Sequence, residues 1–270
     1  VRVYVTDREN NVSPTNSLSW VVDTTKPTKP DIAGTPANGS VTNGVAYDLT
    51  AKSTDATLIT YHWLMDGVAA STATNFTGAV ASGFASHEVQ CYATDQAGNV
   101  SETNGWTWTV DTLAPTNLVI SGYPANGSVT NGTSFRLTAT AMDDMALTYH
   151  WSLDGGDEVT TTDEAFEDDV ADGYGKHVVT CYAKDTAGNV SVTNSWKWTV
   201  DTEAPTKPEI SGTPANGSVT NEPNFHLSAK ATDKTAITYH WLTNGVAAVS
   251  VTNFEGKVTE EGEFVVSCYA

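Results

Sequence analysis

The chain has 270 residues, with 32 acidic and 13 basic side chains and a formal net charge of −19. A field of this sign repels phosphate backbones and anionic membrane surfaces, so neither nucleic acid nor membrane insertion is expected within these residues. No apolar run approaches the roughly 20 residues of a membrane-spanning helix. The charge favours bound cations, although plain solubility explains it equally well.

The chain opens on residues 1–23, which align without a gap with residues 89–111. Both segments carry two alternating apolar and polar runs around a short polar turn, the pattern of paired strands. We therefore expect residues 1–23 to be the C-terminal hairpin of a truncated domain, and the chain to be a window on a longer array.

Residues 24–110 form the first complete repeat, and its strand signals are short and regular. Asp66-Gly67 is a strong hairpin signal, and Pro36 to Asn43 is rich in turn residues around Asn-Gly. No amphipathic helix is visible. Of the seven or so strands expected, five have clear ranges: 29–33, 46–52, 58–65, 87–95 and 106–110. A variable stretch separates the third, 58–65, from the sixth, 87–95.

The same features return along the chain. PANGSVTN occurs at 36–43, 124–131 and 214–221. Asp23, Asp111 and Asp201, each ending a Trp-containing strand, are separated by 88 and then 90 residues. A period of this length indicates an array of independent domains. The expected domains after residues 1–23 are 24–110, 111–200 and 201–270, the last without its final strand.

Several short strands in about 90 residues, with turns every 8–12, are typical of an immunoglobulin-like sandwich. A Trp on the third strand and a Cys on the sixth fit this fold. The second strand carries Leu where a disulfide partner is usual, so we expect Cys91, Cys181 and Cys268 to be small, buried and reduced. The expected fold is all-β: tandem immunoglobulin-like β-sandwich domains arranged as an extended rod.

Two motifs then carry a family resemblance. Ala-x-Asp-x-Ala-Gly-Asn-Val-Ser, at 93–101 and 183–191, precedes Val-Asp-Thr-x-Ala-Pro. Together they resemble the bacterial immunoglobulin-like (Big-type) tandem repeats of large extracellular surface adhesins. The resemblance implies an extracellular, calcium-stiffened stalk at the bacterial cell surface. Its partners would be neighbouring repeats of the same chain, with host-cell or surface glycans contacted through regions outside these residues.

Aspartates are expected to converge where each linker meets the next domain. In such a sandwich the loops after strands two and six lie beside the incoming linker. Three carboxylates there suit calcium, which takes 6–8 oxygen ligands. The alternative is that these residues only cap turns, which Asp does routinely. The candidate ligands are Asp23, Asp55 and Asp95, then Asp111, Asp143 and Asp185, and finally Asp201 and Asp233, with Asp144 as an extra carboxylate.

Three other features have a structural interpretation that we favour. An acidic run in the second repeat differs between repeats and is typical of a solvated face, with an auxiliary cation site as the alternative. His62, His150 and His240 precede a core Trp and are expected to face outward beside tyrosines. The pairs Trp106/Trp108 and Trp196/Trp198 are expected to fill the core rather than stack on sugars. The acidic run comprises Asp163, Glu164, Glu167, Asp168, Asp169 and Asp172.

No nucleophile–base pair, metal-hydrolase motif or phosphate loop is recognisable, so we do not expect an enzyme. The interpretation we favour is a set of structural spacer repeats of a bacterial cell-surface or secreted adhesin, stiffened by calcium and supporting cell adhesion. The alternative is a set of accessory modules, touching carbohydrate, of a secreted polysaccharide-degrading enzyme. A long run of further repeats would favour the first, and an adjacent catalytic domain the second.

Overall fold

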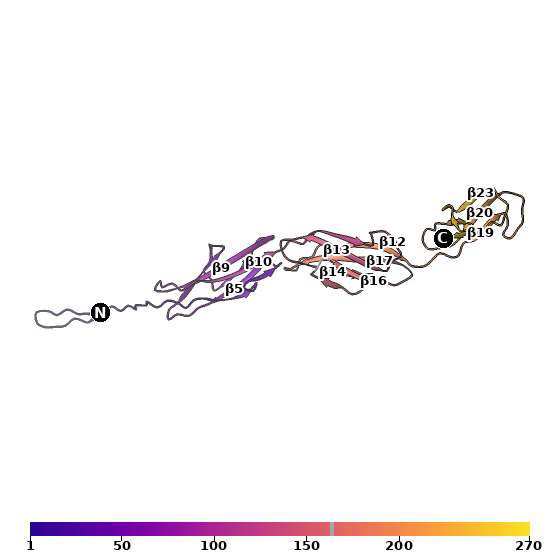
Figure 1. Cartoon of the computed structure of the whole chain (residues 1–270). Helices are drawn as coiled ribbons and strands as arrows, with labels where there is room; N and C mark the ends of the chain where they lie inside the picture. The colour runs from indigo at the N-terminus through magenta and orange to yellow at the C-terminus, as the bar shows by residue number, and fades with distance from the viewer. Residues whose placement is uncertain (163–164) are drawn as a thin grey trace. The chain divides into compact units, whose positions relative to one another are not determined.

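The computed structural model describes residues 1–162 and 165–270, and its regular elements are β-strands throughout these ranges (Figure 1). The chain divides into two compact units. The first comprises residues 1–116, 142–147 and 184–191, and the second comprises residues 117–141, 148–183 and 192–270. Two loops of the second repeat thus group with the first repeat. Among the described residues there is no helix of the length and apolar character needed to span a membrane.

The chain begins with a small antiparallel hairpin of β1 (Arg2–Val3) and β2 (Asn16–Ser17). The carboxylate of Asp7 organises its turn, because Oδ1 accepts the N–H groups of Glu9 and Asn11. The apolar side chains of the segment stay exposed, Trp20 by 65%. Within residues 1–23 the strands pair at Arg2 with Ser17 and at Val3 with Asn16.

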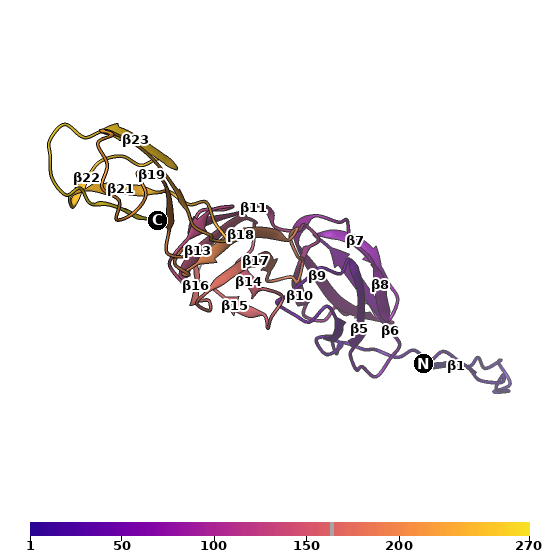
Figure 2. The ribbon, with the colours of Figure 1, turned by 90° about the vertical axis from the view of Figure 1, so that its right-hand side faces the viewer.

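The first sandwich packs a three-stranded sheet on a five-stranded sheet (Figure 2). Pairing is antiparallel except for β4, which runs parallel to β10. The first sheet has the order β3 (Asp31–Thr35), β5 (Ala46–Lys52), β8 (Asn75–Ala79). The second has the order β4 (Ser40–Thr42), β10 (Asn104–Asp111), β9 (Phe84–Asp95), β6 (Ile59–Met65), β7 (Val68–Ser71).

Alternation along the strands builds the core between these sheets. Leu49 is fully buried, and Trp63 is 1% exposed with its indole Nε1 donating to the carbonyl of Ala73 at 2.8 Å. Cys91 and Cys181 are free and buried, and burial raises the pKa of each thiol to about 12. The expectation of buried, reduced cysteines is therefore confirmed for these two, whereas Cys268 is only partly buried.

The second sandwich repeats the plan. Its core Trp151 and Leu137 are fully buried. One sheet has the order β11 (Thr116–Tyr123), β13 (Ser134–Met142), β16 (Ala165–Asp169). The other has the order β12 (Val129–Thr130), β18 (Asn194–Asp201), β17 (Tyr174–Asp185), β14 (Leu147–Leu153), β15 (Val159–Thr161).

The third repeat forms two three-stranded sheets, with Trp241 1% exposed between them. One has the order β19 (Glu209–Thr213), β20 (Asn224–Lys230), β23 (Asn253–Lys257). The other has the order β22 (Val246–Ala247), β21 (His240–Thr243), β24 (Val266–Tyr269). The chain is thus all-β and built of tandem immunoglobulin-like sandwiches, as the sequence predicted.

The sequence pattern gave no residue range for three strands of the first sandwich, β4, β7 and β8. Residues 36–43 were expected to be turn alone, yet they include β4 on the edge beside β10. Asn38 Oδ1 accepts the N–H of Thr107 at 2.8 Å, and Gly39 donates to the Thr107 carbonyl at 2.7 Å. Because β4 and β10 lie far apart in sequence, local composition does not reveal this edge strand. The other two strands, β7 and β8, lie in the stretch after the Asp66-Gly67 turn.

Candidate metal centre at the repeat junctions

The first junction cluster consists of Asp23, Asp55 and Asp95. Asp23 lies in the linker, Asp55 follows β5, and Asp95 is the last residue of β9. One carboxylate oxygen from each lies within 4.8 Å of the other two. The sandwich brings them together because β5 and β9 both end at the edge where the linker enters.

Asp95 is fixed by its own turn. Its Oδ2 accepts Nδ2–H of Asn99 at 2.7 Å, and its Oδ1 accepts the Asn99 main-chain N–H at 2.8 Å. Burial by itself raises the pKa of Asp95, but the hydrogen bonds from Asn99, Ala97 and Gly98 outweigh it and hold that pKa below its ordinary value. The carboxylate is therefore charged and oriented at neutral pH.

A hydroxyl group satisfies part of this first cluster. Thr57 Oγ1 donates to Asp55 Oδ1 at 3.0 Å and lies 3.5 Å from Asp23 Oδ2. Asp55 Oδ1 also accepts the Thr57 main-chain N–H at 2.8 Å. Asp55 Oδ2 remains buried without a hydrogen-bond partner. Turn capping thus explains one oxygen of Asp55 and leaves the other unexplained.

The second junction cluster consists of Asp111, Asp143 and Asp185, again with one oxygen of each within 4.8 Å of the others. Asp111 is the last residue of β10 and pairs with Phe84. It is 1% exposed, its Oδ1 accepts the Leu113 N–H, and its Oδ2 has no hydrogen-bond partner. A charged oxygen this deeply buried is costly unless a cation compensates it.

At Asp143 of the second cluster, the hydrogen bond from the Met145 N–H does not fully offset burial and the neighbouring negative charges. The pKa of Asp143 is raised, first by burial and then by the charges of Asp111, Asp185 and Asp144. A bound cation would reverse this effect, because it stabilises the ionised form of every carboxylate around it.

At the junction with the third repeat, the equivalent cluster has two carboxylates, those of Asp201 and Asp233. Asp201 ends β18, and its Oδ2 is buried without a partner. The pKa of Asp233 is lowered, mainly by the Thr235 N–H and then by its hydroxyl. Lys234 Nζ lies 2.9 Å from Glu203 Oε1. Within residues 1–162 and 165–270, groups of three carboxylates form only at the first two junctions.

The chemistry of both three-carboxylate clusters suits a hard divalent cation. Each offers three carboxylates, and therefore oxygen ligands alone. Calcium accepts such sets with water completing the coordination shell, whereas zinc prefers nitrogen and sulfur donors. The orphaned, buried Oδ2 of Asp111 is the observation that fits a metal and not a turn cap.

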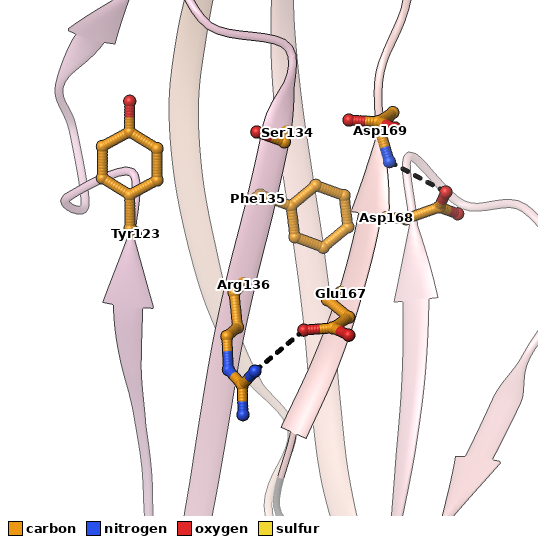
Figure 3. Close-up of a pocket in the computed structure, with 7 residues that line it drawn as sticks. All are labelled: Tyr123, Ser134, Phe135, Arg136, Glu167, Asp168 and Asp169. Carbon is orange, nitrogen blue, oxygen red and sulfur yellow. Dashed lines mark hydrogen bonds and ion pairs between the residues drawn. The ribbon is translucent and has the colours of Figure 1, made fainter.

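The acidic run of the second repeat borders an open hollow of about 360 Å³, which Figure 3 shows with its lining side chains. Arg136 and Glu167 form an ion pair of 3.0 Å in which both side chains are about two-thirds exposed, so the pair contributes little. Asp163 and Glu164 lie outside the described residues. The remaining residues of the run have the exposure of a solvated face.

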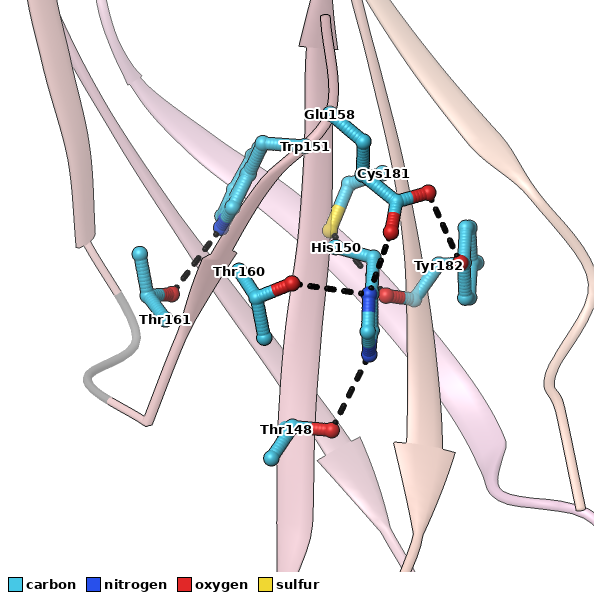
Figure 4. Close-up of polar contacts among 8 residues, drawn as sticks. All are labelled: Thr148, His150, Trp151, Glu158, Thr160, Thr161, Cys181 and Tyr182. Atoms are coloured by element: carbon cyan, nitrogen blue, oxygen red, sulfur yellow. Dashed lines mark hydrogen bonds and ion pairs between the residues drawn. The ribbon is translucent and has the colours of Figure 1, made fainter. Parts of the chain in front are cut away.

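The outward histidines stack on tyrosines, as expected. His150 and Tyr182 are parallel within 2° at 4.6 Å, and His62 and Tyr92 are 4.7 Å apart. In the second repeat Glu158 joins them, since it binds His150 Nδ1 and accepts the Tyr182 hydroxyl, each at 2.8 Å (Figure 4). These contacts stabilise a sheet face.

The Trp pairs fill the sandwich, as the sequence suggested. Trp108 and Trp198 are buried, while Trp106 and Trp196 are half-buried. The indoles of Trp106 and Trp196 donate to the carbonyls of Pro36 and Pro124 at 2.9 and 2.8 Å. Side chains held in this way do not offer a free stacking surface to sugars.

Two kinds of contact escaped the sequence analysis. His87 and His177 bind Asp66 and Asp154 of the hairpin turns, at 3.0 and 2.8 Å. The second kind is an asparagine that reaches the linker: Asn189 Nδ2 donates to the Asp111 carbonyl at 2.8 Å. The signal available for the asparagine was the recurrence of Asp-x-Ala-Gly-Asn at 95–99 and 185–189.

No family model and no curated protein matches this chain. Among solved structures, an I-band fragment of titin is 13% identical over 91% of this chain and 94% of its own length, with a TM-score of 0.45. Fibronectin(III)-like modules of Clostridium thermocellum CbhA are 15% identical over 63% and 94%, with a TM-score of 0.40. Three domains of the highly immunogenic outer capsid protein of bacteriophage RB49 are 15% identical over 89% and 96%, at 0.38. Identities and TM-scores this low assign no function to the chain.

Proposed function

We propose that these residues are structural spacer repeats of a bacterial cell-surface or secreted adhesin, in which calcium at the repeat junctions stiffens an extended row of sandwiches. The repeats hold an adhesive region outside these residues away from the cell. They have no catalytic task of their own, and their immediate partners are neighbouring repeats.

The single observation that carries this proposal is the second junction cluster. Asp111 ends β10 of the first sandwich, Asp143 and Asp185 belong to the second, and one oxygen of each lies within 4.8 Å of the others. The Oδ2 of Asp111 is buried without a partner. A cation held by all three would link two repeats that a short linker otherwise joins.

The proposal places the repeats outside the cell, where calcium can occupy a site of modest affinity. Extracellular calcium modules have dissociation constants of roughly 10⁻⁴–10⁻³ M, a range in which the site fills outside a cell and empties with chelator. A short linker leaves neighbouring domains free to move unless something bridges them. Without a cation, the three carboxylates repel one another and favour an open junction.

The test is small-angle scattering and calorimetry of the whole chain, with calcium and with chelator. We expect calcium to increase the maximum dimension and the melting temperature, and Asp111→Ala to remove most of both effects. Magnesium serves as the control, because it demands a stricter octahedral geometry. If calcium changes neither quantity, the aspartates are turn caps and the calcium-stiffened spacer is wrong.

A further inference from the structure

Asn99 and Asn189 occupy the same position in the first and second repeats, the end of the Asp-x-Ala-Gly-Asn turn. Asn189 Nδ2 donates to the main-chain oxygen of Asp111 at 2.8 Å and to Asp185 Oδ2 at 2.7 Å. Asn99 Nδ2 makes the matching pair, to the Asp23 carbonyl at 3.1 Å and to Asp95 Oδ2 at 2.7 Å. One amide group therefore reaches both the linker and the turn of the following repeat.

Turn formation explains only half of these contacts. In the opening hairpin Asn11 donates through Nδ2 to Asp7 Oδ2 at 2.9 Å, and its N–H donates to Asp7 Oδ1 at 2.8 Å. The same two bonds recur at Asn189 with Asp185. The bond to the Asp111 carbonyl is additional, and it spans 78 positions of sequence. It is therefore a contact of the junction, not of the turn.

The turn holds the asparagine ready for this contact. Asp185 donates its N–H to the Asn189 carbonyl at 3.1 Å, and Lys184 forms a β-bridge with Val190. Asn189 itself is half-buried. A side chain fixed in this way loses little conformational entropy when its second hydrogen finds an acceptor, so the bond forms at low entropic cost.

We propose that Asn99 and Asn189 are positioning residues that tie each linker to the following repeat without a cation. Each fixes the backbone of the linker Asp and, at the same time, the carboxylate of the turn Asp. The bond joins uncharged groups, so it persists in chelator and is not screened by salt. This role goes beyond the proposed calcium function and does not depend on it.

The experiment is hydrogen–deuterium exchange of the whole chain, read in the linker peptide 111–117, in chelator and in calcium. Asn189→Ala removes both Nδ2 bonds, and Asn189→Asp keeps Oδ1 but removes the donor. Asn194→Ala is the matched control, because Asn194 Nδ2 also donates to a distant carbonyl, that of Leu118 at 3.2 Å. It loses a bond of the same kind to β11, outside linker residues 112–115.

In chelator we expect both Asn189 variants to exchange about five- to tenfold faster in this peptide, the factor for losing the neutral hydrogen bond to the Asp111 carbonyl. The other lost bond, to Asp185 Oδ2, lies within the turn. Asn194→Ala should leave the peptide at the wild-type rate. Equal rates for Asn189→Ala, Asn194→Ala and wild type in chelator would overturn the proposal. So would an effect seen in calcium alone and rescued by Asn189→Asp, since that marks a cation ligand. Failure of calcium to slow exchange in the wild type would instead count against the calcium function.

Discussion

The two junction clusters have aspartates at three equivalent positions of the repeat, but different groups surround these carboxylates. In the first cluster, Thr57 supplies a hydroxyl to Asp55, and Asp23 lies half-exposed in an unpaired segment. In the second, Met145 takes the place of that threonine, Asp144 adds a charge, and Asp111 is 1% exposed at the end of a paired strand. Both clusters accept main-chain hydrogen bonds and each keeps one buried oxygen without a partner, but the hydroxyl bond of Thr57 has no counterpart at Met145.

The contrast shows that three carboxylates do not by themselves define a cation site. Hydrogen-bond donors can stabilise such a group without any ion, as Thr57 does in part. Where no such hydroxyl is present, as at Asp143, burial and then the charges of neighbouring aspartates raise the pKa despite the hydrogen bond from the Met145 N–H. We therefore expect the second junction to depend more strongly on calcium than the first.

The largest expected effect is that of Asp111→Asn, compared with Asp23→Asn. Calcium at about 100 times its dissociation constant stabilises a site by about 2.7 kcal/mol, and Asp111→Asn should remove most of that gain. In chelator the same variant should be more stable than wild type, since it removes a buried, uncompensated charge.

Calorimetry with and without calcium measures both effects. Asp23→Asn is the matched control and should lose less of the stabilisation by calcium, because Asp23 is half-exposed. Equal losses in the two variants would remove the distinction between the junctions.

The next effect is a difference in pH dependence between Asp143 and Asp95. The pKa of Asp143 is raised, so in chelator its ionised form destabilises the fold, and that penalty is relieved as pH falls through the raised pKa. The pKa of Asp95 is lowered, so its contribution is present above the ordinary value and is lost as pH falls through the lowered one. Carboxyl ¹³C NMR titration in chelator measures both. Asp143 titrating at or below Asp95 would contradict the difference we describe.

Thr57 and Met145 occupy equivalent positions in the two clusters, and exchanging their side-chain types should make the stability of each junction in chelator resemble that of the other. Met145→Thr offers Asp143 the hydroxyl that Thr57 gives Asp55 and Thr235 gives Asp233. One such hydrogen bond is worth about 0.5–1.5 kcal/mol. We expect the variant to be more stable in chelator by that amount and to gain less from calcium. Denaturant unfolding measures the change, and Thr57→Val should do the opposite at the first junction.

The smallest effect is expected from Asp144, an exposed charge that the first junction lacks. Asp144→Ala should stabilise the second junction in chelator by no more than about 0.5 kcal/mol, and salt should screen much of the difference. Thermal melting at two salt concentrations tests this. A gain that is large or independent of salt would mean that Asp144 acts through more than its charge.

Much of the fold was predictable from the sequence, because period-two alternation and hairpin signals are local. β5 begins and ends at the residues expected for it, and the Asp66-Gly67 turn has the positive φ angles that its sequence favours. The core positions of Trp63 and Leu49 followed from the same alternation. The edge strand β4 did not, because its partner β10 is far away along the chain.

For the junctions, the sequence by itself determined which aspartates gather at one edge, because equivalent aspartates occupy the same position in successive repeats. Only the tertiary structure decided which hydrogen bonds and charges surround each carboxylate. The burial of Asp111, the orphaned oxygen and the reach of Asn189 to the linker depend on neighbours distant in sequence. Charge and hydrogen bonding act through space, so identical motifs acquire different electrostatics where the tertiary contacts differ.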